Sequence, residues 1–309
     1  MTGQTAGRPA KDLLIDAAGV ATATTQRAGI DIRPLETLEQ MQNACAVLDE
    51  VWGIGPDAVS EVQPALLRAL GHGGNYLVGA YTSGAGSHLV GASVAFFTEP
   101  LGAAMHSHIT GVLAGTVGRG VGAALKWHQR QWALERGLSR ITWTYDPLIA
   151  RNSFFNLARL GARPDTYFVD FYGLMNDGPN RGQPTDRIQV VWDLTSQPTL
   201  VCQTLATTGS NTVTGPDVDA AIRAGGAVLL SAGPTGEPVT GPPAGTEPAT
   251  ALIQIPLDIE AIRRTDPELA LRWRYALRSA LELLVADKSW QITNFSRSGW
   301  YLLERAAAA

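Results

Sequence analysis

The chain has 309 residues, a formal net charge of −4 and only 17% charged residues. Single hydrophobic cores stop growing near this length, so the length predicts two domains. The low charge and the lack of a basic cluster argue against nucleic acid as a partner. Cys45 and Cys202 are too few for a disulfide framework. No apolar stretch has the character of a membrane span or a signal peptide, so we expect a cytoplasmic protein with no membrane partner.

The first third of the chain predicts helices followed by a β-meander. Residues 1–27 are expected to form a mobile lead-in with one short helix around Lys11–Ala18. Apolar spacing then predicts a strand and two helices, at Ile30–Pro34, Leu35–Trp52 and Val59–Leu70. Three strand-like runs follow, separated by the turn sequences SGAGS and EPLGA, at Tyr76–Thr82, His88–Phe97 and Met105–Leu113.

A helix is predicted over Val121–Arg136, with an apolar inner face and a polar outer face. The inner face would hold Val121, Leu125, His128 and Trp132, and the outer face Lys126, Gln129, Arg130 and Arg136. A strand at Ser139–Tyr145 would pair in parallel with the strand before the helix. A short helix at Arg151–Leu160 and a strand at Tyr167–Leu174 complete this region.

A turn-rich linker at Asn176–Pro184 predicts a boundary before a second region. This region has three predicted strands, an irregular segment rich in Pro and Gly at Gly233–Pro248, a long helix with Asp266 as N-cap, and a final hairpin. The strands are Arg187–Asp193, Ala227–Ser231 and Ala251–Leu257, the helix is Pro267–Asp287, and the hairpin joins Trp290–Thr293 to Trp300–Leu303.

The glycine-rich turn between strand and helix is a candidate anion-binding site. Gly118, Gly120 and Gly122 allow the backbone to curl until several N–H groups point into one concavity, next to the positive end of a helix. Their spacing does not match a dinucleotide-binding motif, and no Gly-Lys-Ser/Thr follows for a P-loop. A different phosphate-binding turn is therefore predicted.

In this turn the sequence resembles the GNAT superfamily of acyl-CoA-dependent N-acyltransferases. Gly120 and Gly122 match the glycines of its Arg/Gln-x-x-Gly-x-Gly/Ala signature, whereas Val117 stands at the Arg/Gln position. The words HSHITGV, GRGVGAALKWHQR, ITWTYDPL, RNSFFNLARLGA and DRIQVVW resemble a branch of predicted acyltransferases in that superfamily. The superfamily resemblance covers residues 28–175. It implies a mixed, mostly antiparallel α/β sheet flanked by helices.

The resemblance also implies roles for individual residues. The backbone N–H of Val112 would stabilise an oxyanion, and Asn152 would contact CoA, unless it is only a first-turn residue of its helix. The phosphates and pantetheine would contact Val112 and the loop, which comprises Gly118, Arg119, Gly120, Val121, Gly122 and Ala123. Leu157 stands where many members have a tyrosine acid; Tyr145, Tyr167 or Tyr172 would have to substitute.

The residues themselves offer candidates for a general base. His106, His108 and Thr110 lie two apart on a strand, so their side chains should share one face. An imidazole titrates near neutral pH, which makes His108 a candidate base, with a hydrogen-bonded structural role as the alternative. Asp146 follows a strand end, where ligands bind in open sheets, and is a second candidate base or else a turn aspartate.

Together these features predict an N-acyltransferase that moves an acyl group, acetyl or succinyl, to a small-molecule amine such as an amino acid. Acyl-CoA is the expected co-substrate, and no metal is expected. The oligomeric state is left open, with a homodimer as one alternative. The predicted domains are a lead-in at 1–27, a GNAT domain at 28–180 and an accessory domain at 181–309, which could be a degenerate GNAT-like half. The alternative is a non-catalytic acyl-CoA-binding or sensing protein, because Val117 and Leu157 depart from the family pattern.

Overall fold

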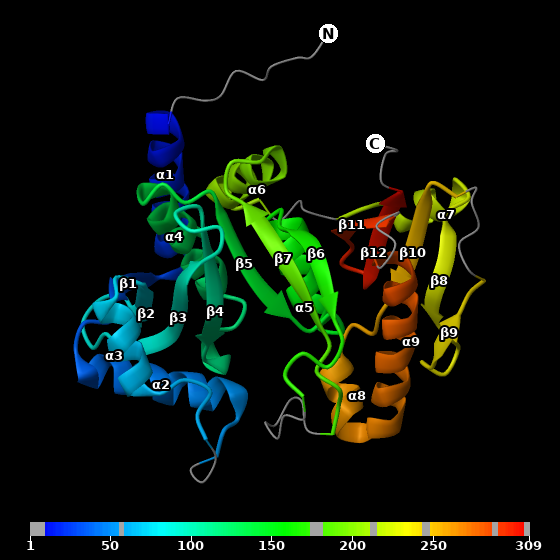
Figure 1. Cartoon of the computed structure of the whole chain (residues 1–309), viewed down its shortest axis with the longest axis horizontal. Helices are drawn as coiled ribbons and strands as arrows, with labels where there is room; N and C mark the ends of the chain where they lie inside the picture. Colours follow the sequence, from blue (N-terminus) through cyan, green and yellow to red (C-terminus); the bar gives the residue numbers. More distant parts are fainter. Residues whose placement is uncertain are drawn as a thin grey trace. The chain divides into compact units, whose positions relative to one another are not determined.

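The computed structural model describes residues 10–55, 59–173, 182–210, 215–242, 248–285 and 290–305 (Figure 1). The chain divides within one strand into two compact units. Unit 1 comprises Met1–Thr142 and Asp193–Ser210, and unit 2 comprises Trp143–Trp192 and Asn211–Ala309. The predicted fold class is confirmed: a mixed, mostly antiparallel seven-stranded sheet with flanking helices, in the strand order β1-β2-β3-β4-β5-β7-β6, accompanies a smaller second sheet.

Unit 1 contains the predicted meander and the helices around it. Its elements are α1 Ala10–Ala28, β1 Ile30–Pro34, α2 Leu38–Trp52, α3 Pro64–His72, β2 Tyr76–Thr82, β3 Leu89–Thr98, β4 Ala104–Val112, η1 Ala114–Thr116, α4 Val121–Glu135, the first half of β5 Arg140–Tyr145, and α6 Gln197–Thr208. Neighbouring strands from β1 to β4 are antiparallel, and β5 pairs in parallel with β4, as predicted for a helical crossover.

The main core of unit 1 lies between the meander and the two helices α2 and α3. A capping box between Thr37 and Gln40 opens α2, and Gly53 closes it in the left-handed conformation (φ 63°). Met41 and Leu48 from α2 then pack with Leu67, Val94 and other apolar side chains. Because α2 covers β3 and β4, this core fixes the strand that carries the candidate histidines.

The start of the chain differs from the predicted mobile lead-in. From Ala10 the described residues form the 19-residue helix α1, which packs on α4 and α6. Its buried positions include the small side chains Ala17 and Ala21 together with Val20. Small residues give a weak periodic signal in the sequence, so the helix appeared shorter than it is.

The prediction of a polar, solvent-facing side for α4 is wrong. Lys126, Gln129 and Arg130 are all buried. The Arg130 guanidinium donates to the Leu194 carbonyl (2.7 and 2.9 Å) and to Gln203 Oε1 (2.8 Å). An amphipathic pattern indicates one packing partner, whereas α1 and the segment 193–210 bring further partners to this helix.

Unit 2 contains the rest of the larger sheet and the whole second sheet. Its elements are the end of β5, α5 Ala150–Ser153, the π-helix η2 Phe154–Arg159, β6 Arg163–Phe168, β7 Arg187–Asp193, α7 Val218–Arg223, β8 Ala227–Ala232, β9 Pro238–Thr240, β10 Thr250–Gln254, α8 Ile259–Thr265, α9 Pro267–Val285, β11 Trp290–Phe295 and β12 Trp300–Arg305. The second sheet has the order β11-β12-β10-β8-β9.

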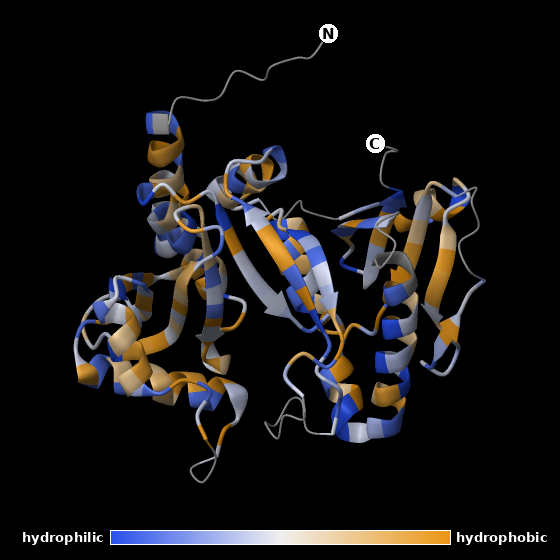
Figure 2. Cartoon of the chain, in the orientation of Figure 1, coloured by the Kyte–Doolittle hydropathy of each residue, from blue (hydrophilic) through white to orange (hydrophobic). Residues whose placement is uncertain are grey.

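Several predictions for this region are confirmed and others shift. The Leu269 N–H donates to Asp266 Oδ1 (2.9 Å), so Asp266 caps α9 as expected, and β11 and β12 form the expected antiparallel hairpin. Along α9, Ala270, Trp273, Leu277 and Leu281 are buried, and the helix carries both hydrophobic and hydrophilic bands in Figure 2. The strand predicted at Tyr167–Leu174 instead ends at Phe168, and the supposedly irregular segment contains β9.

The predicted linker and the boundary near residue 180 differ from the observed division. Residues 174–181 of the linker lie outside the described residues. β7, expected in the second region, pairs antiparallel with β6 in the larger sheet. The chain then returns to unit 1 for α6 before it enters the second sheet.

Candidate functional site

A β-bulge in β4 sets the directions of the candidate histidine side chains. Val94 of β3 pairs with Ile109 and Ala95 pairs with Ser107, so His108 is the extra residue. His106 and His108 both contact the Phe96 ring, with centroids 5.4 and 5.8 Å apart, and share a face as predicted. Thr110 does not share it: its hydroxyl lies 2.8 Å from Ser93 Oγ on the α4 side. The extra residue reverses the alternation that the sequence pattern assumes.

The two histidines have different surroundings. His106 is half-buried and bonds Thr142 Oγ1 through Nδ1 (3.1 Å). Burial, with the nearby His108 and Lys126 charges, lowers the pKa of His106 to about 4. His108 is exposed, and desolvation against its neighbours lowers its pKa below the usual 6.5. Both rings are therefore neutral near pH 7, and His108 is the one that solvent reaches.

Behind the bulge lies a buried polar network that connects β3, β4 and α4. Lys126 Nζ donates to Ser107 Oγ (2.8 Å) and to Gln129 Oε1 (3.2 Å). The Gln129 amide donates in turn to Ser93 Oγ (3.4 Å), which also bonds Thr110. Burial lowers the pKa of Lys126 to about 7. Sequence analysis did not predict this network. Its signal in the sequence is a lysine and a glutamine three residues apart on one helix.

The glycine turn has the geometry of an anion-binding loop. Gly118 and Gly120 have φ of 86° and 88°, and a Cβ at either position would meet no atom within 4 Å. Gly120 is the N-cap of α4. The N–H groups of Val121, Gly122 and Ala123 belong to the first helical turn, where no acceptor exists within the helix. The open space at the two glycines and these donors would suit a phosphate group.

The register also leaves part of β4 with one strand partner. β5 pairs with β4 over Ala104–His106, opposite Arg140–Thr142. In the described registers, the part of β4 from Ser107 to Val112 pairs with β3 alone. Backbone groups on the other edge of this part, close to Val112, have no strand partner in these registers.

Asp146 lies in unit 2 in an ion-pair cluster. It is 8% exposed and accepts from Arg263 Nη2 (2.6 Å) and from Arg274 Nη2 (2.7 Å). Burial alone would raise its pKa, but the charges of Arg274, Arg263 and Arg187 outweigh burial and hold the pKa well below the usual range. Such a carboxylate accepts a proton poorly, which favours the structural interpretation over the base.

The other predicted residues of unit 2 are placed as follows. Asn152 lies in the first turn of α5, and its N–H donates to the Ile149 carbonyl (3.0 Å). Leu157 is buried. Tyr167 donates to Asp186 Oδ2 (2.5 Å), and burial raises the pKa of Tyr145 to about 12. Tyr172, 45% exposed and bonded to Thr144 Oγ1 (3.2 Å), is the most accessible of the three tyrosines.

Asp186, which directly precedes β7, forms an ion pair within unit 2. It is fully buried and accepts from Arg278 Nε (2.9 Å) and Nη2 (2.6 Å) on α9. It also accepts from Tyr167, so it connects α9 to β6 within unit 2. His128, which lies in unit 1, bonds the Tyr76 hydroxyl (2.9 Å) and is the satisfied core-facing residue that we predicted.

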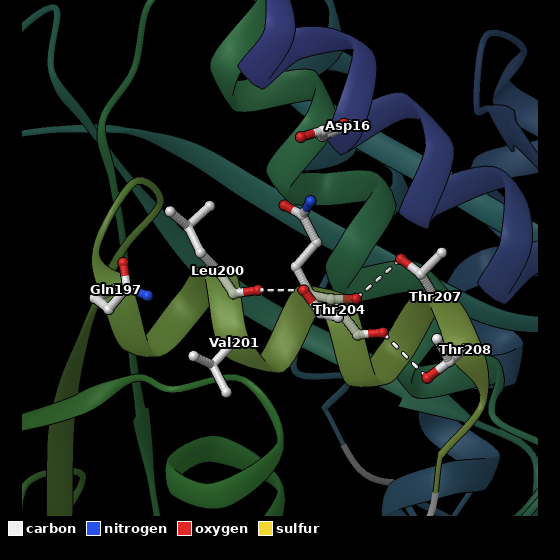
Figure 3. Close-up of a pocket in the computed structure, with 8 residues that line it drawn as sticks. Asp16, Gln197, Leu200, Val201, Thr204, Thr207 and Thr208 are labelled. Carbon is white, nitrogen blue, oxygen red and sulfur yellow. Dashed lines mark hydrogen bonds between the residues drawn. The ribbon is translucent and has the colours of Figure 1, made fainter. Parts of the chain in front are cut away.

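A pocket of about 470 Å³ lies along α6 and Asp16 of α1 (Figure 3). The hydroxyls of Thr204, Thr207 and Thr208 point back to carbonyls of their own helix. None of the predicted site residues lines this pocket. It is therefore not the candidate site.

Among the described helices, none is long and apolar enough to cross a membrane. The same part of the chain contains no group of three or more metal-ligating side chains.

Comparisons with known proteins find solved structures that resemble this chain, but no match to its sequence. No family model matches the sequence, and no curated protein does. RimJ of Mycobacterium smegmatis, solved with CoA-disulfide, is 18% identical, with a TM-score of 0.46 over 60% of this chain and 91% of its own. The ribosomal-protein-S18-alanine N-acetyltransferase of Escherichia coli is 13% identical, with a TM-score of 0.43 over 54% and 95%. The putative acetyltransferase yncA of Salmonella typhimurium, solved with acetyl-CoA, is 12% identical, with a TM-score of 0.43 over 54% and 94%.

The topology of the larger sheet gives the clearest relation. The elements β1, α2, α3, β2, β3, β4, α4, β5, α5 and β6 follow one another in the order that the GNAT resemblance implies. The glycine turn and the parallel pairing of β4 with β5 are present as the sequence predicts. Over residues 30–168 the chain therefore has the order of helices and strands that the resemblance implies.

Proposed function

We propose that the chain is an acyl-CoA-dependent N-acyltransferase whose acceptor is a small amine such as an amino acid. The observation that carries the proposal is the glycine turn, where two positive-φ glycines and the first turn of α4 present unpaired N–H groups to open space. Val121, Gly122 and Ala123 would hold the pyrophosphate of CoA, with Arg119 beside them and Val112 toward the thioester. Bound acyl-CoA would supply an activated carbonyl carbon.

His108 is the proposed general base. Its exposed ring is neutral near pH 7, so it can take the proton that the amine loses as its nitrogen bonds to the acyl carbon and the carbon–sulfur bond breaks. The thiolate is a fair leaving group, because thiols ionise near pH 8.5. Of the three tyrosines that could stand in for the usual acid, Tyr172 is the most exposed. The N–H of Val112 is the proposed oxyanion donor.

The low charge of the chain fits a small, weakly charged acceptor better than a polymeric one. The second candidate function, acyl-CoA binding without catalysis, is favoured by two features. Val117, at the usual Arg/Gln position, is 70% exposed, and Leu157, at the usual acid position, is buried.

Release of free thiol from acetyl-CoA and succinyl-CoA, in the presence of a panel of amines, separates the two functions. An enzyme releases thiol in an amine-dependent manner, whereas a binder is stabilised by CoA and releases none above background. His108→Ala should lower turnover by about 10²- to 10⁴-fold and leave CoA binding intact. His88→Ala, at an exposed loop histidine, is the matched control.

The pH dependence of turnover gives a second readout. Because the pKa of His108 is lowered, the acid limb of the wild-type profile should lie below pH 6.5, and it should disappear in His108→Ala. If this variant kept near-normal turnover and the same acid limb, simple binding of an already deprotonated amine would replace base catalysis.

A further inference from the structure

Lys126 of α4 bonds the residue next to the candidate base. Its Nζ donates to Ser107 Oγ at 2.8 Å, and Ser107 directly precedes His108 on β4. Both ends of this hydrogen bond are buried, with Lys126 6% and Ser107 4% exposed. A hydrogen bond in a buried site of low dielectric is stronger than the same bond in water. Ser107 is therefore held firmly against α4, which packs on β3 and β4.

A second branch of the same network reaches the other side of His108. Lys126 Nζ also donates to Gln129 Oε1 (3.2 Å), and the Gln129 amide donates to Ser93 Oγ on β3 (3.4 Å). Ser93 Oγ lies 2.8 Å from the hydroxyl of Thr110, two residues after His108. Hydrogen bonds from α4 thus reach β4 before the candidate base directly and after it by way of β3.

His108 depends on this support because it is the extra residue of the bulge. Val94 and Ala95 are consecutive on β3, whereas their partners on β4, Ile109 and Ser107, enclose His108. A bulge disrupts the ladder locally and leaves the extra residue unpaired. In the described registers β5 pairs only with the first residues of β4, before this point. The place of the His108 ring is therefore set by the residues on either side of it.

We propose that Lys126 is a positioning residue for His108 and acts through the two branches of this network. His108 takes the amine proton in the proposed function, and this role of Lys126 rests on that assignment. Because α4 begins at the glycine turn, the helix that would bind the CoA phosphates also fixes the place of the base. A firm link of this kind matters for rate, since a misplacement of about 1 Å can cost about 10²-fold.

Titration of the His108 ring by NMR tests the placement without using catalysis; the signal that is absent from His108→Ala assigns the ring. Desolvation lowers the pKa of His108 in the wild type. In Lys126→Met the bulge loses its support and the ring should become better solvated, so its pKa should rise toward 6.5. Unchanged titration in this variant would overturn the proposal.

Ser107→Ala separates the lost contact from the lost charge, and it serves alone if Lys126→Met does not fold. It removes the same hydrogen bond but keeps the lysine. The pKa of His108 should therefore rise in this variant as well. A rise in Lys126→Met that is absent from Ser107→Ala would reflect only the missing charge and would also overturn the proposal.

A double-mutant cycle with His108→Ala tests the effect on turnover, at a temperature where all variants are folded. Lys126→Met should lower kcat by about 10- to 10²-fold and leave KM for acetyl-CoA near the wild-type value. The same change should have little further effect in His108→Ala, where no base is left to misplace. An equal loss in both backgrounds would show a general structural role and would refute positioning.

Arg130→Met is the matched control on the same helix. Arg130 is another buried cation of α4, and its guanidinium donates to the Leu194 carbonyl and to Gln203. This variant should lower Tm, leave the pKa of His108 unchanged and reduce turnover by the same factor with or without His108. A wild type that releases no thiol, or a His108→Ala variant with full turnover, would refute the proposed function; the ring titration would still decide whether Lys126 positions His108.

Discussion

At the scale of single residues, charge neighbours decide what Asp146 can do. Its place after β5 made it a candidate base, and the sequence spacing contained no trace of its partners, which lie more than a hundred positions away on α8 and α9. Two guanidiniums within 2.7 Å keep it ionised. A carboxylate that stays ionised in this way is suited to hold α8 and α9 in place and accepts a proton poorly.

Asp146→Asn should therefore destabilise the fold by about 3–5 kcal/mol, since it leaves buried arginines without their counter-charge. Melting temperature and thiol release should fall together, and activity should recover at a temperature where the variant is folded. A variant that folds like the wild type and still loses turnover would instead identify Asp146 as the base.

Asp146 also predicts a pH dependence. Its pKa in the folded chain is lowered, so its contribution to stability is complete above the unfolded value of about 3.9 and is lost as pH falls below it. Denaturant unfolding should show a steeper loss of stability below pH 4 for the wild type than for Asp146→Asn.

Lys126 shows the opposite sign of pH dependence. Burial lowers its pKa from 10.5 to about 7, so above pH 7 the unfolded chain binds a proton that the folded chain has released. Stability from this group therefore rises with pH from about 7 to about 10. Lys126→Met should flatten that rise, and at pH 9 it should cost roughly 1–3 kcal/mol because Ser107 and Gln129 lose their donor. Lys11→Met, at an exposed position of α1, is the control; an unflattened rise in Lys126→Met would refute the assignment.

Residue patterns along the sequence predicted some side-chain directions and missed others. The alternation rule placed His106 and His108 on one face, and the structure agrees. It failed at Thr110 because one extra residue at the bulge shifts every later position. A bulge depends on how two strands pair, which no single-strand pattern contains. The burial of the arginines was equally hidden, because their partners come from distant segments.

At the scale of elements, the glycine turn and α4 form the proposed CoA-binding unit. A Cβ at Gly122 would meet one atom, Val112 Cγ2, at 4.0 Å, so a larger side chain fits the fold but fills the space in front of the helix N-terminus. Acetyl-CoA at about 100 times its dissociation constant should stabilise the wild type by roughly 2.7 kcal/mol.

Gly122→Val should remove that stabilisation, as seen by thermal melting. Gly19→Val is the matched control: Gly19 lies in α1, where a Cβ would meet nothing within 4 Å, and the acetyl-CoA shift should persist. The same shift in both variants would place CoA elsewhere.

Helices and strands with a strong periodic pattern were predictable from the sequence. Short elements and elements that depend on tertiary packing were not. The meander, α4, α9 and the final hairpin follow from apolar spacing and turn residues. The structure adds α6, α7, α8 and β9, which are short or rich in Thr, Ala and Gly, and it continues α5 as a π-helix. These elements form where tertiary packing supports them, so local propensity carries little signal.

At the scale of the whole molecule, the two compact units are not two successive stretches of sequence. A boundary near residue 180 follows from the Pro- and Gly-rich composition there, yet β7 and α6 come after it and belong to the larger sheet and to unit 1. Composition marks where a chain is locally irregular. It does not record a later segment that returns to an earlier unit.

This return predicts how fragments behave. Residues 1–180 contain α1 and α4 but not their partners in 193–210. The fully buried Arg130 then loses the Leu194 carbonyl and Gln203, and Arg27 loses the carbonyls of Ala206 and Thr207. Loss of these acceptors from a buried guanidinium destabilises unit 1, and the apolar faces that packed against β7 and α9 become exposed. Residues 1–180 should be poorly soluble, with fast amide exchange in α4.

Residues 1–210 restore the acceptors of Arg130 and Arg27 at Leu194, Gln203, Ala206 and Thr207 while still lacking the second sheet, so they form the matched comparison. We expect α4 in this longer fragment to keep slow amide exchange, because α1 and the strands β1 to β4, on which it packs, belong to unit 1. Unit 2 should remain unfolded there, since Asp146 and Asp186 have lost the arginines of α8 and α9. Equal protection of α4 in the two fragments would show that the returning segment does not stabilise unit 1. A soluble, fully active 1–180 fragment would show in addition that everything beyond residue 180 is dispensable for catalysis.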